Sequence, residues 1–221
     1  HPDEAEIFDF SKKDDTTFRF QADRLADDTD PDVIIIKART VLNKLSVTKF
    51  DKLSDEFMEV GIHTTTELIE RAVELIISKA QMEEHFCFMY ADLCAKIFNL
   101  WDEESKSGGE STGQVFRVAL LNKCRDEFDI DRNAEIAKIR ANESLSEEEK
   151  EEKEILAKKR YTGHMRFIGE LFLKDMVNPK TMTKCLGELI QETDDEALVC
   201  MCKLMLTVGS KLESYDRRKG L

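Results

Sequence analysis

The sequence predicts an all-α fold, an α-solenoid in which about four antiparallel helix pairs stack one upon another. Helix-forming residues dominate the 221-residue chain, whereas glycine (9) and proline (3) are too scarce for the many turns of an all-β fold. Outside one charged insert, apolar residues recur at helical spacing, and the pairs recur at roughly 35–45 residues, the range of two-helix repeats. A single pair leaves one apolar face uncovered, so we expect stability only from the stack.

The first two helix pairs follow an acidic arm, residues 1–32. The first pair is expected over about 33–61, with a break near Ser46–Thr48. The second begins at Thr64, where the spacing from Thr64 to Glu67 matches a capping box. Its partner helix is expected near 85–101. The apolar stripe of its first helix has the i, i+3, i+4, i+7, i+11 spacing and consists of Ile69, Ala72, Val73, Ile76 and Ala80.

A charged insert, residues 131–159, interrupts the third pair. The pair is expected to begin near Gln114 and to close with a helix over Arg160–Met176. Ser146 and Glu149 have the spacing of a helix cap inside the insert, but the insert lacks a wide apolar stripe. We therefore expect an exposed segment that is partly helical or mobile.

The fourth pair is introduced by Asn178-Pro179, an N-cap residue followed by proline at the first helical position. Thr193 and Glu196 match a further capping box, and Gly209 marks a fray or stop of the last helix. The phrase FIGELF, Phe167–Phe172, is expected to pack as core against Leu198–Leu206. The predicted stripe of the last helix consists of Leu198, Met201, Cys202 and Met205.

The arm combines negative charge with isolated aromatic residues. Residues 1–33 hold 11 acids and 4 bases, net −7, which predicts disorder or a loosely held arm. Two interpretations stay open for its phenylalanines: docking anchors for a partner, or packing against the first helices of this chain. These phenylalanines are Phe8, Phe10, Phe18 and Phe20.

Composition also excludes several classes of protein. No apolar run reaches the length of about 18 residues that a membrane span needs. No signal peptide is visible and the chain starts at His1, so we expect a fragment of something longer. Six cysteines fall in helical stripes and indicate buried thiols, and four histidines lack ligand spacing, so neither a metal site nor a cofactor is expected.

No catalytic motif is present in the sequence. The P-loop and the G-x-G-x-x-G, G-x-S-x-G and H-E-x-x-H patterns are all missing. His85 and Cys87 are two residues apart, which on a helix points them to different faces, so they do not form a nucleophile pair. We therefore expect a binding protein rather than an enzyme.

Basic residues cluster in spite of a net charge of −13. Uneven placement of the acids leaves room for a local basic face that contacts RNA, although high-affinity nonspecific binding by the whole chain is not expected. The alternative is an ordinary solvated surface. The candidate RNA-binding residues are Lys158, Lys159, Arg160, Arg166, Lys123 and Arg125.

Five segments, in order along the chain, resemble the middle domain of eukaryotic translation initiation factor 4-gamma. The most specific is Gly163–Phe172, with FIGELF intact, and a charged insert before it is also a habit of that family. Together the segments cover about residues 33–213. The others are Val41–Leu45 (VLNKL) with Lys49-Phe50, Phe86–Cys94, Phe116–Phe128 (FRVALLNKCRDEF) and Leu198–Leu212.

The resemblance implies a HEAT-type α-solenoid that acts as a scaffold. In the family, this domain holds the DEAD-box RNA helicase of cap-dependent initiation, favours a closed arrangement of its two lobes, and contacts RNA and other initiation factors. Transferred to this sequence, it implies helicase binding by Asn43, Lys44 and Phe50 of the first pair, together with the phenylalanines of the arm.

Two departures from the family pattern affect this transfer. The family domain usually has five helix pairs, whereas four are predicted here. The family often carries a tryptophan in the arm to dock on the helicase, whereas the only tryptophan of this chain is Trp101, at a helix end. The arm phenylalanines are therefore expected to substitute for it.

The function expected from these observations is that of a cytoplasmic translation-initiation scaffold domain. It would bind and stimulate the helicase and help to recruit mRNA to the small ribosomal subunit. The alternatives are a related scaffold of mRNA decay or nuclear cap binding, and a direct RNA-binding module. The intact LNKL and FIGELF phrases weigh against the first alternative. The Tyr-x-x-x-x-Leu motif that binds the cap-binding protein is absent from the sequence.

Overall fold

The computed structural model describes residues 29–104, 111–192 and 195–218, so most of the predicted acidic arm, with its four phenylalanines, lies outside the described part. Within these ranges the protein is helical and has no strand. Three 3₁₀ turns, η1 (Val47–Lys49), η2 (Ile62–Thr64) and η3 (Glu84–Phe86), connect the helices of the first two pairs. The α-helices are α2 (Pro31–Lys44), α3 (Phe50–Glu59), α4 (Thr66–Met82), α5 (Cys87–Glu104), α6 (Thr112–Phe128), α7 (Arg132–Ala141), α8 (Glu147–Leu173), α9 (Pro179–Leu189) and α10 (Asp195–Arg218).

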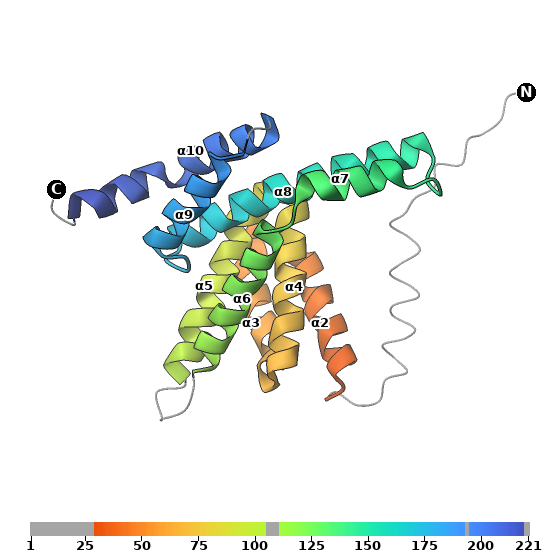
Figure 1. Cartoon of the computed structure of the whole chain (residues 1–221). Coiled ribbons are helices and arrows are strands. Elements are labelled where there is room, and N and C mark those ends of the chain that lie inside the picture. The colour runs from red at the N-terminus through yellow and green to blue at the C-terminus, as the bar shows by residue number, and fades with distance from the viewer. Residues whose placement is uncertain (1–28, 105–110, 193–194, 219–221) are drawn as a thin grey trace, which may run out of the picture.

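The helices stack as pairs in chain order, which confirms the predicted α-solenoid. The pairs are α2 with α3, α4 with α5, α6 with α8, and α9 with α10 (Figure 1). One continuous core of buried apolar side chains extends from Ile34 in α2 to Val208 in α10. Each pair buries its apolar face only against its neighbours, which is the physical basis of a repeat stack.

The helix that carries FIGELF, α8, crosses the stack obliquely over the end of α4 and the start of α5 (Figure 1). Gly163 lies at this crossing, where a Cβ atom would be only 2.2 Å from the carbonyl oxygen of Gln81. A glycine is therefore needed for the two backbones to approach so closely. The apolar residues of FIGELF are buried, which confirms that this phrase is core; they are Phe167, Ile168, Leu171 and Phe172.

A chain of buried polar groups joins three helices beside this crossing. His164 Nε2 lies 2.9 Å from the carbonyl oxygen of Cys124, and His164 Nδ1 lies 3.5 Å from Gln81 Nε2. Gln81 Nε2 also donates to Glu127 Oε2 at 2.9 Å. These contacts suit a neutral imidazole that carries its proton on Nε2. Burial lowers the pKa of His164, which favours the same neutral form.

The charged insert is a helical hairpin, so the structure has the helical one of the two predicted alternatives, and more of the insert is helical than expected. It consists of α7 and the first turns of α8, so α8 begins at Glu147 rather than at Arg160, and it projects away from the stack (Figure 1). Only a narrow apolar seam supports it, with Ile136 and Ala157 buried. Caps and ion pairs therefore contribute much of its local order.

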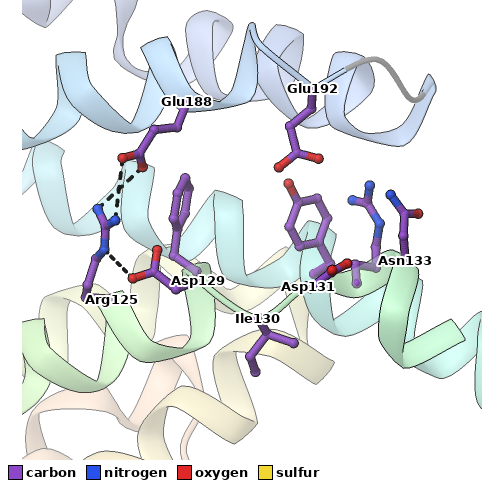
Figure 2. Close-up of a pocket in the computed structure, with 10 residues that line it drawn as sticks. Arg125, Asp129, Ile130, Asp131, Asn133, Glu188 and Glu192 are labelled. Carbon is purple, nitrogen blue, oxygen red and sulfur yellow. Dashed lines mark hydrogen bonds and ion pairs between the residues drawn. The ribbon is translucent and has the colours of Figure 1, made fainter. Parts of the chain in front are cut away.

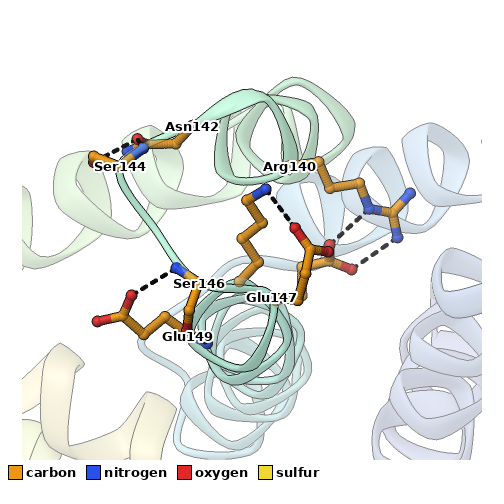
Figure 3. Close-up of polar contacts among 8 residues, drawn as sticks. Arg140, Asn142, Ser144, Ser146, Glu147 and Glu149 are labelled. Carbon is orange, nitrogen blue, oxygen red and sulfur yellow. Dashed lines mark hydrogen bonds and ion pairs between the residues drawn. The ribbon is translucent and has the colours of Figure 1, made fainter.

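The tip of the hairpin shows these polar contacts (Figure 3). Ser146 Oγ accepts from the Glu149 backbone N–H at 3.2 Å, and Glu149 Oε2 accepts from the Ser146 N–H at 2.8 Å, which confirms the predicted cap. Arg140 donates to both carboxylate oxygens of Glu154, at 2.6 and 2.7 Å. The Arg140 hydrogen bond is the main reason that the pKa of Glu154 is lowered.

Of the other predicted helix starts, the cap of α9 is confirmed and the predicted cap of α4 is wrong by one residue. Asn178 caps α9, with Oδ1 accepting from the Thr181 N–H at 2.8 Å and Pro179 in the first turn, as predicted. The cap of α4 is Thr65, whose hydroxyl accepts from the Leu68 N–H at 3.2 Å. The Thr64 hydroxyl instead donates to the Gly61 carbonyl. The predicted cap at Thr193 lies outside the described residues.

The last helix, α10, buries a different stripe from the one predicted. Leu198, Cys202 and Met205 are exposed, and only Met201 of the predicted four is partly buried against the core. The exposed Cys202 also corrects the expectation that all six thiols are buried. The error arises because both faces of α10 are apolar, so spacing alone cannot distinguish them. The buried stripe consists of Ala197, Cys200, Leu204 and Val208.

Two further expectations concern the same helix. Gly209 does not stop α10, which continues to Arg218. FIGELF packs on the predicted region: a Cβ atom at Gly169 would lie 2.9 Å from Leu204 Cδ1. The prediction that FIGELF packs against this region of α10 is therefore right, and the predicted buried face of α10 is wrong.

Candidate docking surface

The residues predicted to bind a partner from the first helix pair lie together at one corner of the stack. We define the α2–α3 corner as residues 39–52, which end α2, form η1 and start α3. Asn43 and Lys44 are exposed at the end of α2, and Phe50 is half-buried against the core at the start of α3. Between them Val47 projects from η1 with 57% of its surface exposed.

Local backbone geometry explains why the chain turns here. Leu45 has an extended conformation that ends α2, and its N–H donates to the Leu42 carbonyl at 3.2 Å. The Lys49 N–H then donates to the Ser46 carbonyl at 3.1 Å and closes η1. Leu45 itself packs against the core. The turn is therefore fixed at both ends, and the exposed side chains stand on an ordered backbone.

A lysine from the second helix pair holds the corner in place. Lys96 Nζ, on α5, lies 2.6 Å from Asp55 Oδ1 and donates to Ser54 Oγ at 2.7 Å. The same ammonium lies 5.9 Å from the centre of the Phe50 ring. Phe50 is thus a fixed wall of the corner rather than a free anchor. The sequence does not indicate that Lys96 belongs to this corner, because Lys96 lies on another helix.

The corner carries positive charge that no carboxylate neutralises. Residues 39–52 contain four cations and a single carboxylate, Asp51, a local net charge of +3 in a chain of net charge −13. In the described ranges none of the four forms an ion pair, and all four are exposed. These cations are Arg39, Lys44, Lys49 and Lys52.

The six cations predicted to bind RNA have a different environment. Lys158 pairs with Glu196 at 2.7 Å, Arg166 lies 3.8 Å from Glu84, and Lys159 is exposed. These pairs join α8 to neighbouring parts of the stack, since Glu196 belongs to α10 and Glu84 to η3.

The other three predicted RNA-binding cations are also paired. Lys123 and Arg160 both approach Glu127, at 4.0 and 3.6 Å, and Lys123 also pairs with a second carboxylate, Glu74, at 2.9 Å. Arg125 pairs with Asp129 at 2.6 Å and with Glu188 at 3.4 Å. Hydrogen bonds to Glu74 and Asp129 are the main causes of the raised pKa values of Lys123 and Arg125. Phosphate binding by this set would compete with existing ion pairs.

A cavity of about 430 Å³ lies between the α6–α7 loop, α8 and the end of α9 (Figure 2). Its lining carries both signs of charge: Arg125 with its two carboxylates on one side, and Arg132 stacked 4.1 Å from the Tyr161 ring centre on the other. Burial raises the pKa of Tyr161 to about 12, so its hydroxyl is neutral. This mixed lining does not select a ligand of one charge.

Three of the buried thiols, those of Cys87, Cys94 and Cys124, are not activated as nucleophiles. Burial raises the pKa of Cys87 to about 12 and raises those of Cys94 and Cys124 as well, so all three are protonated at neutral pH. Within the described ranges, no three His, Cys, Asp or Glu side chains are grouped to hold a metal ion. In the same ranges no helix combines the length and apolarity that crossing a membrane requires.

Comparison with known proteins gives a consistent family relationship. A family model described as the MIF4G domain matches residues 37–221. The chain is 34% identical over 203 residues to human eukaryotic translation initiation factor 4 gamma 2, covering 86% of this chain and 22% of that protein. It is 33% identical over 182 residues to eukaryotic translation initiation factor 4G of Arabidopsis thaliana, covering 79% of this chain and 10% of that protein. The chain thus spans only about a fifth of the length of the first relative and a tenth of the length of the second.

A solved structure shares the fold. It is the crystal structure of the MIF4G domain of Trypanosoma cruzi translation initiation factor EIF4G5, which aligns with a TM-score of 0.59 at 20% sequence identity. The alignment covers 80% of this chain and 77% of that chain. At this identity the likeness concerns the arrangement of the helices alone.

Proposed function

Because the chain belongs to the MIF4G domain family of eukaryotic translation initiation factor 4 gamma, we propose that it is a translation-initiation scaffold. In this proposal it binds and stimulates the DEAD-box RNA helicase of initiation and helps to recruit mRNA to the small ribosomal subunit. Its role is non-catalytic and cytoplasmic. The relatives are initiation factors by name, and the helicase is the partner implied by the first-pair residues Asn43, Lys44 and Phe50.

The observation that carries the proposal is the exposure of the α2–α3 corner on a fixed backbone. Asn43, Lys44 and Val47 face solvent, while Lys96 of α5 pairs with Asp55 of α3 and lies 5.9 Å from the centre of the Phe50 ring. A surface that is ordered before binding loses little conformational entropy when a partner docks. This is the property expected of a scaffold that positions a mobile enzyme.

Stimulation follows if the scaffold binds one arrangement of the helicase lobes better than the others. A binding partner shifts a conformational equilibrium only by its differential affinity for the two states. A tenfold preference for the closed arrangement corresponds to about 1.4 kcal/mol, and it can raise the closed population by at most tenfold. The rigid stack supplies such a preference if two parts of it contact two lobes at once.

The test uses a purified DEAD-box initiation helicase, its RNA-dependent ATPase rate and a direct binding measurement. The wild-type chain should bind and raise the rate. Val47→Asp should weaken both effects, because a carboxylate would replace the apolar side chain at the centre of the corner. The matched control is Val118→Asp on α6, at a residue with 55% exposure against 57% for Val47. A wild-type chain that neither binds nor stimulates the helicase would refute the proposal.

Direct RNA binding through the six predicted cations is the alternative, and ion pairing of five of them weighs against it. A salt titration with single-stranded RNA separates the two functions. Binding through phosphates gives a log K that falls linearly with log salt concentration. A flat slope would exclude RNA binding by this set.

A further inference from the structure

We propose that the α2–α3 corner recognises an acidic surface on its partner, with Val47 inserted in an apolar recess that carboxylates surround. This inference rests on the proposed function and specifies the chemistry of the helicase surface that docks there. Its basis is the position of the cations that form no ion pair. Neither the family relationship nor the sequence motifs say that the partner surface is acidic.

The distribution of unpaired cations singles out this corner. Among the lysines and arginines whose side chains the structure describes, eight are exposed and have no ion pair or hydrogen bond to a carboxylate. Four lie within the 14 residues of the corner. The other four are dispersed: Lys138, Lys153 and Lys159 on the hairpin and Lys180 at the start of α9.

Most other cations of the described stack are paired, so the fold neutralises positive charge nearly everywhere else. Examples that link different helices are Lys123 with Glu74, Lys174 with Asp92 and Lys211 with Asp175. Asp55, in the next turn of α3, is already engaged by Lys96 at 2.6 Å, and neither Asp51 nor Glu56 forms an ion pair with a corner cation in the described ranges. The positive charge of the corner is therefore available to a partner.

Charge complementarity follows from the charge of the whole chain. The net charge of the whole chain is −13, of which residues 1–33 contribute −7, so the chain as a whole repels an acidic partner, and a site with local positive charge attracts it. The Debye length of about 8 Å at physiological salt confines this attraction to the corner itself. Such a surface orients an acidic partner as well as binding it.

The occupant is a protein surface rather than RNA because apolar side chains lie among the cations of the corner. Val47 stands between Lys44 and Lys49 in the chain, exposed by more than half, and the Phe50 ring lies next to them. A phosphate backbone offers no apolar recess for an aliphatic side chain, whereas protein interfaces combine an apolar centre with a charged rim.

The test is a charge reversal with a matched control. The triple variant Lys44→Glu, Lys49→Glu, Lys52→Glu changes the net charge by −6 at the corner. The control Lys138→Glu, Lys153→Glu, Lys180→Glu changes it equally at unpaired lysines elsewhere. All six side chains are exposed, so both variants should fold, as circular dichroism can check.

We expect the corner variant to weaken helicase binding by on the order of ten- to a hundredfold at low salt, and the control by about twofold or less. Raising the salt should reduce the wild-type affinity and shrink the difference. Lysine substitutions at carboxylates of the helicase should restore binding of the corner variant.

The outcomes separate the inference from the proposed function. A wild-type chain that does not bind the helicase refutes both. Binding that the corner and control variants weaken equally overturns the inference alone. Loss of RNA affinity in the corner variant with unchanged helicase affinity identifies RNA as the occupant and also overturns it. Self-association of the wild-type chain that only the corner variant abolishes identifies a second copy, with the same consequence.

Discussion

The close crossing of α4 and α8 leads to the most direct prediction, the effect of Gly163→Ala. The added Cβ would lie 2.2 Å from the carbonyl oxygen, 2.8 Å from the carbonyl carbon and 2.9 Å from the Cα of Gln81. Favourable carbon contacts begin at about 3.5 Å, so the two helices must separate by on the order of 1 Å. All three atoms belong to the backbone and cannot rotate away.

The magnitude follows from two opposing contributions. Overpacking of a core costs about 1–3 kcal/mol, and the backbone clash places Gly163→Ala at the upper end. Replacing glycine by alanine inside a helix returns about 1 kcal/mol of helix propensity. We therefore expect a net loss of about 2 kcal/mol in the free energy of unfolding. With a urea m-value of about 2–3 kcal/mol/M, the midpoint should fall by roughly 1 M.

Urea unfolding followed by circular dichroism measures this midpoint, and Gly187→Ala is the matched control. Gly187 lies in α9, and no atom lies within 4 Å of its added Cβ. The control should therefore gain about 0.5–1 kcal/mol from helix propensity alone. A Gly163→Ala variant that unfolds at or above the wild-type midpoint would show that the helices do not cross as described.

Three further predictions test other parts of the stack. Leu171→Asp places an unpaired carboxylate at a fully buried position and should cost about 4 kcal/mol or more, whereas Leu206→Asp, at 88% exposure, should change the stability by about 0.5 kcal/mol or less; thermal melting compares them. The pKa of His164 is lowered in the folded state, so near and below the ordinary pKa of about 6.5 the unfolded chain binds more protons than the folded chain. The free energy of unfolding should therefore decrease as the pH is lowered from about 7 towards the folded pKa. Melting at several pH values should show a smaller loss in His164→Gln, and equal slopes would contradict this assignment. Lys96→Met should loosen the start of α3, and faster amide hydrogen exchange there, without global unfolding, is the expected result.

Much of the repeat architecture could be predicted from local sequence signals. The break near Ser46–Thr48, the cap at Asn178 and the cap at Ser146 all depend on contacts within a few residues, and all three are present. The burial of FIGELF follows in the same way from apolar spacing within a single helix.

The errors arise where a signal needs information from another helix. Apolar spacing predicts the wrong face of α10 because Leu198 and Met205 are as apolar as the buried Leu204 and Val208. The position of α8 decides which face of α10 is covered, and the apolar spacing within α10 does not indicate that position. The extent of helix in the hairpin is hard to predict for a related reason, since Arg140 and Glu154 meet only after the chain has turned.

For the docking surface, too, contacts that are local in the sequence can be predicted, and contacts between helices cannot. The sequence by itself places Asn43, Lys44 and Phe50 in the first helix pair, on either side of its predicted break, because they are close together in the chain. Only the tertiary structure decided that Lys96 holds the α2–α3 corner, and that the lysines of the corner remain unpaired while Lys123 of α6 and Lys158 of α8 are neutralised. Residue types determine which charges exist, but ion pairing depends on distances between helices, which arise only when the pairs stack.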